Sequence, residues 1–178
     1  LIQVSISGYG QSGPYSQRAG HDLNYLALCG VLAMGGDRDA EPCLAGVQIA
    51  DLAGGSLLAL AGLLAAVVQR QRTGRGQMVD AAMFDGALSL ATKLLARVQA
   101  GADDPVPRGM TLNGRYPCYN VYQCADAGYM SLGALEPKFW EAFCRAMERP
   151  DLKPGQFGGE EVIEQVQDLF AARTREQW

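Results

Sequence analysis

Residues Ala45–Asp80 read AGVQIADLAGGSLLALAGLLAAVVQRQRTGRGQMVD, and this stretch predicts the element around which the chain is organised. Its twelve successive residues Leu57–Val68 are all apolar or glycine. The run is too short to span a bilayer and is typical of a buried helix. Asp51 and the pair Gly54-Gly55 come just before it. We therefore expect an acidic side chain at the mouth of a buried helix, beside glycines that allow close backbone approach.

The segments on either side predict alternating strands and helices. Leu1–Ser7 alternates and carries branched side chains, which indicates a strand. His21–Val31 has apolar residues spaced for one helical face, and Gln77–Ala82 reads as a short strand leading into a helix that ends near Gln99. Residues 1–100 therefore predict an α/β domain built from strand-helix units.

The glycines Gly8, Gly10 and Gly13 match the spacing G-x-G-x-x-G. A dinucleotide-binding fingerprint needs a helix that opens at the last glycine, because the amides of that helix hold the pyrophosphate. Here Gly13 is followed by Pro14 and further turn residues. The sequence therefore predicts a turn and argues against a nucleotide fingerprint.

The second half of the chain predicts a smaller domain. Residues 101–114, GADDPVPRGMTLNG, lack apolar periodicity, and we expect a linker there. In residues 115–178 two strand-like runs flank the turn signal Asp126-Ala127-Gly128, and helices are expected from Pro137 and over 160–173. This part is predicted to be a small α+β domain with a hairpin followed by helices.

Composition excludes several classes of function. The formal net charge is −4, with 15 basic residues scattered among 19 acidic ones, so nucleic acid is not an expected partner. Five irregularly spaced cysteines and a single histidine predict no metal site and fit reduced cytoplasmic thiols. No signal peptide or membrane segment is expected. The chain opens inside a strand-like run and stops in what reads as a helix start, which indicates a fragment of a longer protein.

Three separated blocks resemble a known family. GHDLNYLALCGVL, then GVQIADLAGGSLLALAGLLAAVVQRQRTGRGQMVDAAM, then YNVYQCADAGYMSLGALEPKFW resemble the α-methylacyl-CoA racemase branch of the family III CoA-transferase superfamily. The resemblance covers nearly the whole chain and implies the family III CoA-transferase fold. Residues 1–100 would be the C-terminal portion of a Rossmann-like large CoA-binding and catalytic domain, and 115–178 an incomplete small domain. It also implies an interlocked homodimer of chains about twice this length.

Inverting a carbon next to a thioester carbonyl needs one acid/base group on each side and a means of holding the enolate oxygen. The imidazole of His21 titrates near neutrality and suits one role, while the carboxylate of Asp51 suits the other. The resemblance places the catalytic histidine and aspartate at these two positions. Without it, a helix cap or a surface position would be the commoner role for each.

Further site residues follow from the same blocks. The resemblance matches Glu136 to a glutamate that orients the histidine or tunes its charge. It also matches Asp22 and Tyr25 to positions in the substrate pocket. The backbone amides of Gly54 and Gly55 are candidate donors to the enolate oxygen. Without the resemblance, Glu136 before a proline would be only a favourable charge at a helix start.

One position departs from the family pattern. Some racemases carry an asparagine four residues before the matching aspartate, whereas this chain has Val47 there and the polar Gln48 beside it.

The expected function is racemisation or epimerisation at C2 of 2-methyl-branched acyl-CoA thioesters, an isomerase reaction of fatty acid metabolism. The reaction would need no metal and no cofactor beyond the CoA of the substrate. A membrane is not an expected partner. The expected location is cytoplasmic, or peroxisomal or mitochondrial in a eukaryote, and little activity is expected of the fragment alone.

Two alternatives stay open. One is a family III CoA-transferase in which Asp51 is a nucleophile that forms an anhydride and then a thioester with CoA. His21 separates the two enzymes, because the resemblance implies an aromatic or other residue at its position in most transferases. The other alternative is a region that serves mainly for dimerisation, in which His21 and Asp51 are structural.

Overall fold

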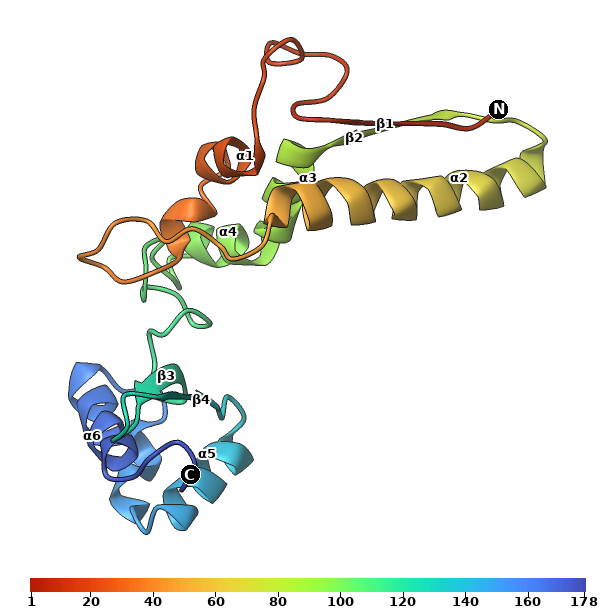
Figure 1. Cartoon of the computed structure of the whole chain (residues 1–178). Coiled ribbons are helices and arrows are strands. Elements are labelled where there is room, and N and C mark those ends of the chain that lie inside the picture. The colour runs from red at the N-terminus through yellow and green to blue at the C-terminus, as the bar shows by residue number, and fades with distance from the viewer. The chain divides into compact units, whose positions relative to one another are not determined.

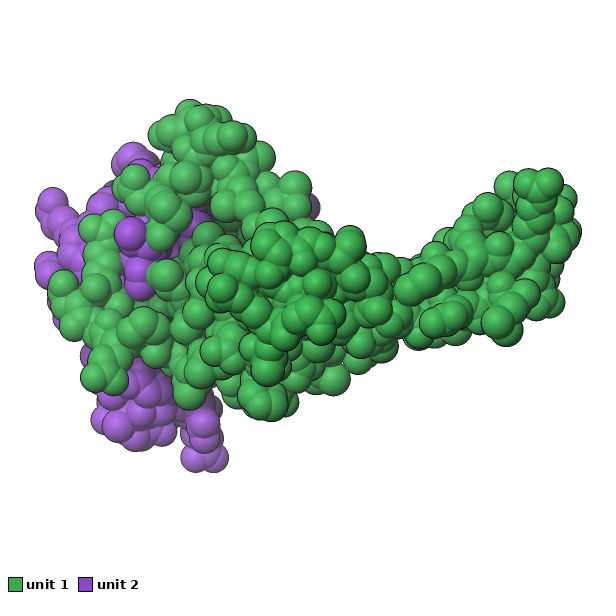
Figure 2. Space-filling view, turned by 90° about the horizontal axis from the view of Figure 1, so that it is seen from above, with its two compact units in different colours: residues 1–105 green, residues 106–178 purple.

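Two units, Leu1–Pro105 and Val106–Trp178, make up the chain, and the computed structural model describes all 178 residues (Figures 1 and 2). The boundary between the units lies inside the stretch 101–114 that the sequence predicts as a linker. Each unit has its own sheet of two strands and its own cluster of buried apolar residues.

The first unit is a β-α-β crossover. Strand β1 (Gln3–Ser7) pairs in parallel with β2 (Met78–Ala82), with Gln3 opposite Met78 and Ser7 opposite Ala82. The helices between and after these strands are α1 (Asp22–Leu28), a short 3-10 turn (Leu32–Met34), η2 (Ala50–Leu57), α2 (Leu58–Thr73), α3 (Met83–Leu90) and α4 (Thr92–Gln99). The α/β fold class predicted from the sequence is confirmed.

The central helix begins earlier than the sequence indicates. It starts at Ala50 with the π-helical η2, continues as α2, and ends at Gly74, whose φ of 72° lets its N–H return to the carbonyl of Arg70. Gly54 and Gly55 therefore lie inside the helix, and the expectation that the helix follows them is wrong. Asp51 occupies the first turn.

The prediction of a buried helix is also wrong. The small residues Ala59 and Ala66 are buried, and a Cβ on Gly62 would lie 2.7 Å from a methyl carbon of Val79, so this side packs on the sheet. The opposite side is apolar but open, and nothing in the first unit covers it. Its exposed leucines and valine are Leu57, Leu60, Leu64 and Val68.

The length of this helix bears on the expectation about membranes. By length and composition alone, Ala50–Thr73 is apolar enough to cross a membrane, although core helices of soluble proteins and signal sequences meet the same criterion. Only 22% of its most apolar window is buried inside the chain. The helix is thus longer than the twelve-residue run from which no membrane segment is expected, and that expectation stays a prediction.

Helices η2 and α3 cross at very short range because both carry glycine at the crossing. A Cβ on Gly54 would lie 2.7 Å from the backbone nitrogen of Ala87, and one on Gly86 would collide with the carbonyl oxygen of Gly54. Only residues without a side chain allow two helix backbones to approach so closely. The glycines of the central stretch thus set the distance between the helices.

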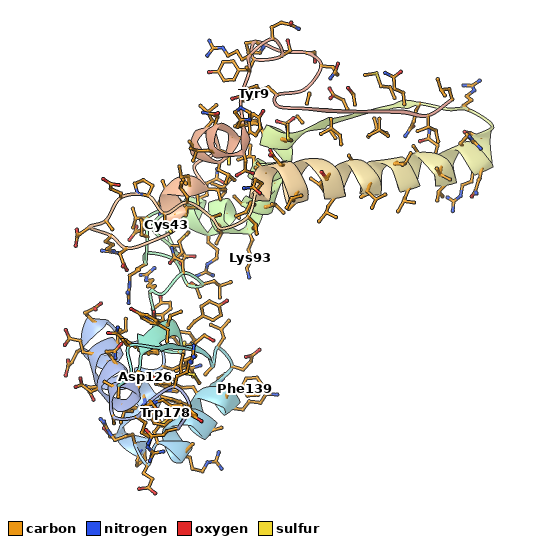
Figure 3. The ribbon with its side chains drawn as sticks, in the orientation of Figure 1. Tyr9, Cys43, Lys93, Asp126, Phe139 and Trp178 are labelled. Atoms are coloured by element: carbon orange, nitrogen blue, oxygen red, sulfur yellow. The ribbon has the colours of Figure 1, made fainter.

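The glycine loop after β1 forms turns, as the sequence predicts. Gly10 and Gly13 have φ values of 86° and 93°, and no helix opens after them. The loop is held to the sheet by Asp80, whose Oδ2 accepts a hydrogen bond of 2.8 Å from the backbone N–H of Gln11. Tyr9, labelled in Figure 3, contacts the ring of Tyr25 edge-on with 5.1 Å between centroids.

The second unit is a hairpin covered by helices, which agrees with the predicted small α+β part. Strands β3 (Tyr119–Gln123) and β4 (Tyr129–Gly133) are antiparallel, and α5 (Pro137–Ala146), the 3-10 segment Pro150–Gly155 and α6 (Glu160–Ala171) follow. The indole N–H of the buried Trp140 donates to the carbonyls of Leu152 and Lys153, both at 3.1 Å. The core residues are Cys118, Tyr122, Ala134, Trp140, Phe143, Cys144, Leu152, Ile163, Val166 and Phe170.

Replacing Gly86 by alanine should separate the two crossing helices. The new methyl group meets the backbone oxygen of Gly54, which no side-chain rotation relieves. We expect a net loss of about 1–3 kcal/mol of stability in the first unit despite the better helix propensity of alanine. Amide hydrogen exchange of α3 measures this loss. Tryptophan fluorescence would not report it, because both tryptophans lie in the second unit. Gly35→Ala is the control, because open space surrounds that glycine, and unchanged protection of α3 in Gly86→Ala would contradict the packing argument.

Candidate active site

His21 is placed by the start of α1. It is the N-cap residue of that helix, with extended φ and ψ of −124° and 172°. Its backbone N–H donates to Asn24 Oδ1 at 3.0 Å, and its carbonyl accepts from the backbone N–H of Asn24 at 2.8 Å. These bonds fix the backbone of His21, while its side chain is exposed and lines a pocket.

Asp51 comes to the same pocket from the first turn of the central helix. The pocket has a volume of about 290 Å³ and brings together one imidazole and two carboxylates, from His21, Asp22 and Asp51. Four leucines supply an apolar wall, so the space suits a molecule with both a polar reacting group and an aliphatic chain. The other residues that line it are Leu23, Leu26, Leu32, Leu44, Ala45 and Gln48.

Asp22 borders this pocket, and its carboxylate is bonded to the central helix. Its Oδ1 accepts hydrogen bonds from the backbone N–H groups of Ala50 at 2.6 Å and Asp51 at 3.1 Å. The first N–H groups of a helix have no partner within the helix, and a negative charge at that end is favourable. The predicted contact between Asp22 and substrate stays a prediction.

Tyr25 is buried behind the pocket rather than among its lining residues. It is 2% exposed, and its hydroxyl donates to the carbonyl of Gly20 at 2.6 Å. A Cβ on Gly8 would lie 2.5 Å from that hydroxyl and one on Gly20 would lie 2.8 Å from the ring, so both glycines make room for it. Burial, then the nearby Tyr9 and the charge of Asp51, raise the pKa of Tyr25.

The remaining predicted residues lie elsewhere. Gly54 and Gly55 are buried inside the helix against α3 and do not line the pocket of His21 and Asp51. Glu136 belongs to the second unit, where it is the exposed N-cap residue of α5 directly before Pro137. Their predicted roles, donation to an enolate oxygen and orientation of the histidine, stay predictions.

Sequence reasoning missed part of the pocket wall. Leu44 and Ala45 come from a segment of irregular structure, where no periodicity points to a buried or a site-facing position. At the position where the family pattern is broken, Val47 is 60% exposed, whereas Gln48 lines the pocket. The polar residue of this pair therefore reaches the site, one position later than the asparagine of some racemases.

The pocket thus holds both an imidazole and a carboxylate, and comparison with known proteins identifies the family to which the chain belongs. All of residues 1–178 match CoA-transferase family III. The chain belongs to that family. The resemblance to α-methylacyl-CoA racemases drawn from its three blocks is confirmed by racemase relatives that match 100% of the chain at 37–38% identity.

Two relatives show how close the family III chain is to racemases and to transferases. It is 38% identical over 183 residues to α-methylacyl-CoA racemase of Homo sapiens, covering 100% of the chain and 48% of that protein. It is 38% identical over 157 residues to succinyl-CoA:mesaconate CoA-transferase of Haloarcula marismortui, covering 85% of the chain and 39% of that protein. The chain spans about half the length of the curated racemase it matches.

Solved structures share the fold of this family III chain. The crystal structure of Rv3272 from M. tuberculosis has a TM-score of 0.75 and 27% identity, covering 100% of the chain and 48% of that structure. This structural match covers the whole chain and agrees with the family assignment.

Tyr25→Phe should alter how stability depends on alkaline pH. The raised pKa means that the unfolded chain ionises first as the pH rises above about 10, so wild-type stability falls there, and phenylalanine removes that loss. Near neutrality the variant should be less stable by about 1 kcal/mol, because the carbonyl of Gly20 loses its partner.

Urea unfolding followed by circular dichroism between pH 8 and pH 11 measures both effects. The gap between wild type and Tyr25→Phe should narrow as the pH rises. Tyr15→Phe removes a hydroxyl from a more exposed ring and is the control. A constant gap across this range would contradict the burial argument.

Proposed function

We propose that the chain forms the catalytic part of an enzyme that racemises or epimerises C2 of 2-methyl-branched acyl-CoA thioesters. The observation that carries the proposal is that His21 and Asp51 line one pocket of about 290 Å³. They come from segments separated by an irregular loop, so only folding brings them together. Because the chain spans about half the length of its relatives, the proposal concerns the complete protein that contains it.

The reaction is a transfer of two protons through an enolate. One base takes the C2 proton, the electron pair moves into the thioester carbonyl, and the conjugate acid on the opposite side returns a proton to C2. Neutral His21 with protonated Asp51 serves one direction, and charged Asp51 with protonated His21 serves the other. Electrons and protons balance within this cycle, so the proposed reaction needs no redox group and no cofactor beyond the CoA of the substrate.

The lining of the pocket supports such chemistry. The side chains of Leu23, Leu26 and Leu44 line the pocket and suit an aliphatic acyl chain. No hydrogen bond within the chain involves the carboxylate of Asp51, whereas the side chain of His21 faces the backbone N–H of Asn24 in a capping box at the start of α1. Both groups border the space in which a molecule would bind. These features support a site in which both proton carriers face the substrate.

CoA transfer is the second candidate, favoured by the transferase relative at 38% identity. In that reaction the Asp51 carboxylate attacks the thioester carbonyl, which forms an anhydride and releases CoA thiolate. The thiolate then attacks the aspartyl carbonyl, which forms an enzyme thioester and frees the first acid. An incoming carboxylate is converted by the reverse steps. This chemistry uses Asp51 and leaves His21 without a required role.

Deuterium exchange in the complete protein separates the two reactions. The experiment starts from a single enantiomer of 2-methylacyl-CoA in D₂O. We expect a racemase to incorporate deuterium at C2 and to form the other enantiomer. Mass spectrometry measures the label, and chiral chromatography measures the inversion. CoA transfer to an added carboxylate without exchange at C2 would favour the second candidate. We expect the chain alone to show little or no turnover.

Single-base variants test the assignment of the two proton carriers. His21→Ala and Asp51→Asn should each slow racemisation by at least about 100-fold, the usual worth of a positioned acid or base. Each variant should keep hydrogen exchange at C2 of only one enantiomer, because it retains the base on one side of the substrate. The enantiomer that still exchanges should differ between the two variants.

Asp85→Asn is the matched control, since this exposed carboxylate lies on α3 outside the pocket. Unchanged racemisation in His21→Ala would assign the pair a structural role, as in a region used mainly for dimerisation.

A further inference from the structure

Asp22 joins the two segments that carry the proton carriers. On one side it is bonded through the peptide chain to His21, the N-cap residue of α1. On the other side its Oδ1 accepts hydrogen bonds from the N–H groups of Ala50 and Asp51, 28 and 29 residues further along the chain. The dipeptide His21-Asp22 therefore holds one base directly and the backbone of the other base through a carboxylate.

The bonds of Asp22 account for the start of the central helix. Ala50 and Asp51 are its first two residues, whose N–H groups have no partner inside the helix. The next N–H, that of Leu52, donates to the carbonyl of Gln48 at 3.0 Å. Without the Asp22 carboxylate, the first two amides would lose their partner, and only the packing of Ala50 in the apolar cluster of Tyr25 and Leu26 would hold this turn to α1.

Other contacts hold the backbone of His21 and the later turns of the central helix, so the Asp22 bonds act on the first turn of that helix. Asn24 already fixes the backbone of His21 through two hydrogen bonds. The central helix is fixed further along by its glycine crossing with α3 at Gly54. Between these two anchors, the first turn of the helix is held to α1 by the packing of the buried Ala50 and by the Asp22 bonds, and the Asp22 bonds are the polar contact that reaches the backbone of Asp51.

We propose that Asp22 is a positioning residue, whose carboxylate sets the spacing between His21 and Asp51 across the pocket. The inference rests on the proposed function, because spacing matters only if both groups act on one substrate. Misplacement of a reacting group by about 1 Å can cost about 100-fold in rate. The role needs an acceptor oxygen at this place, and it needs neither a negative charge nor contact with the substrate.

The test compares Asp22→Ala with Asp22→Asn in the complete protein. Asparagine keeps a carbonyl oxygen that accepts both N–H groups, whereas alanine removes it. We expect Asp22→Ala to lower kcat for racemisation by about 10- to 100-fold, with KM changed by less than about threefold. Asp22→Asn should recover kcat to within about threefold of wild type.

Hydrogen exchange of the two amides gives a readout that does not depend on activity. Protection of the Ala50 and Asp51 amides should fall in Asp22→Ala and persist in Asp22→Asn. Asp85→Ala is the control, because it removes a carboxylate from the first turn of another helix without breaking a hydrogen bond to a helix amide. It should leave both readouts unchanged.

Two results would overturn the inference. If Asp22→Asn keeps the amide protection but is as slow as Asp22→Ala, the carboxylate acts on the substrate itself. If Asp22→Ala loses protection while kcat per folded molecule is unchanged, the contact is only structural. Should the wild type transfer CoA without exchange at C2, the proposed function fails together with the His21–Asp51 spacing role, and what is left to test is whether Asp22 places Asp51. The same ratios are then measured on CoA transfer, in which Asp51 reacts as well.

Discussion

The close crossing of η2 and α3 is the constraint on which the rest of the first unit depends. Gly54 and Gly86 bring two helix backbones to a distance that no side chain allows, and α3 is in turn continuous with strand β2. The start of the central helix is thereby fixed relative to the sheet. Asp51 lies three residues before Gly54, so this contact and the bonds from Asp22 hold its backbone, rather than the irregular loop that precedes it.

Periodicity predicted the elements because it reports local structure. The β1 strand, α1, the hairpin and the helices of the second unit all lie where alternation, apolar spacing and turn residues indicate them. The start of the central helix was misplaced because glycine normally marks a helix end. Here Gly54 and Gly55 serve contacts with α3, which no local pattern reveals.

The candidate site was predictable only in part. His21 and Asp51 were identified from the chemistry of proton transfer and from the family blocks, and the structure brings them to one pocket. The bond from Asp22 to the helix start spans 28 residues and depends on tertiary structure, so residue types alone could not show it. Leu44 and Ala45 gave no signal, because irregular segments carry no periodicity.

The two carboxylates of the pocket differ in what their oxygens already bind. Asp22 offers Oδ1 to two helix amides, whereas no hydrogen bond within the chain involves the carboxylate of Asp51. A group that exchanges a proton or attacks a carbonyl in each turnover must bring an oxygen within hydrogen-bond reach of the substrate. A group that fixes geometry must keep its bonds throughout the cycle. This difference supports the proposed chemistry at Asp51 and the proposed positioning role of Asp22, although both are aspartates that border the same space.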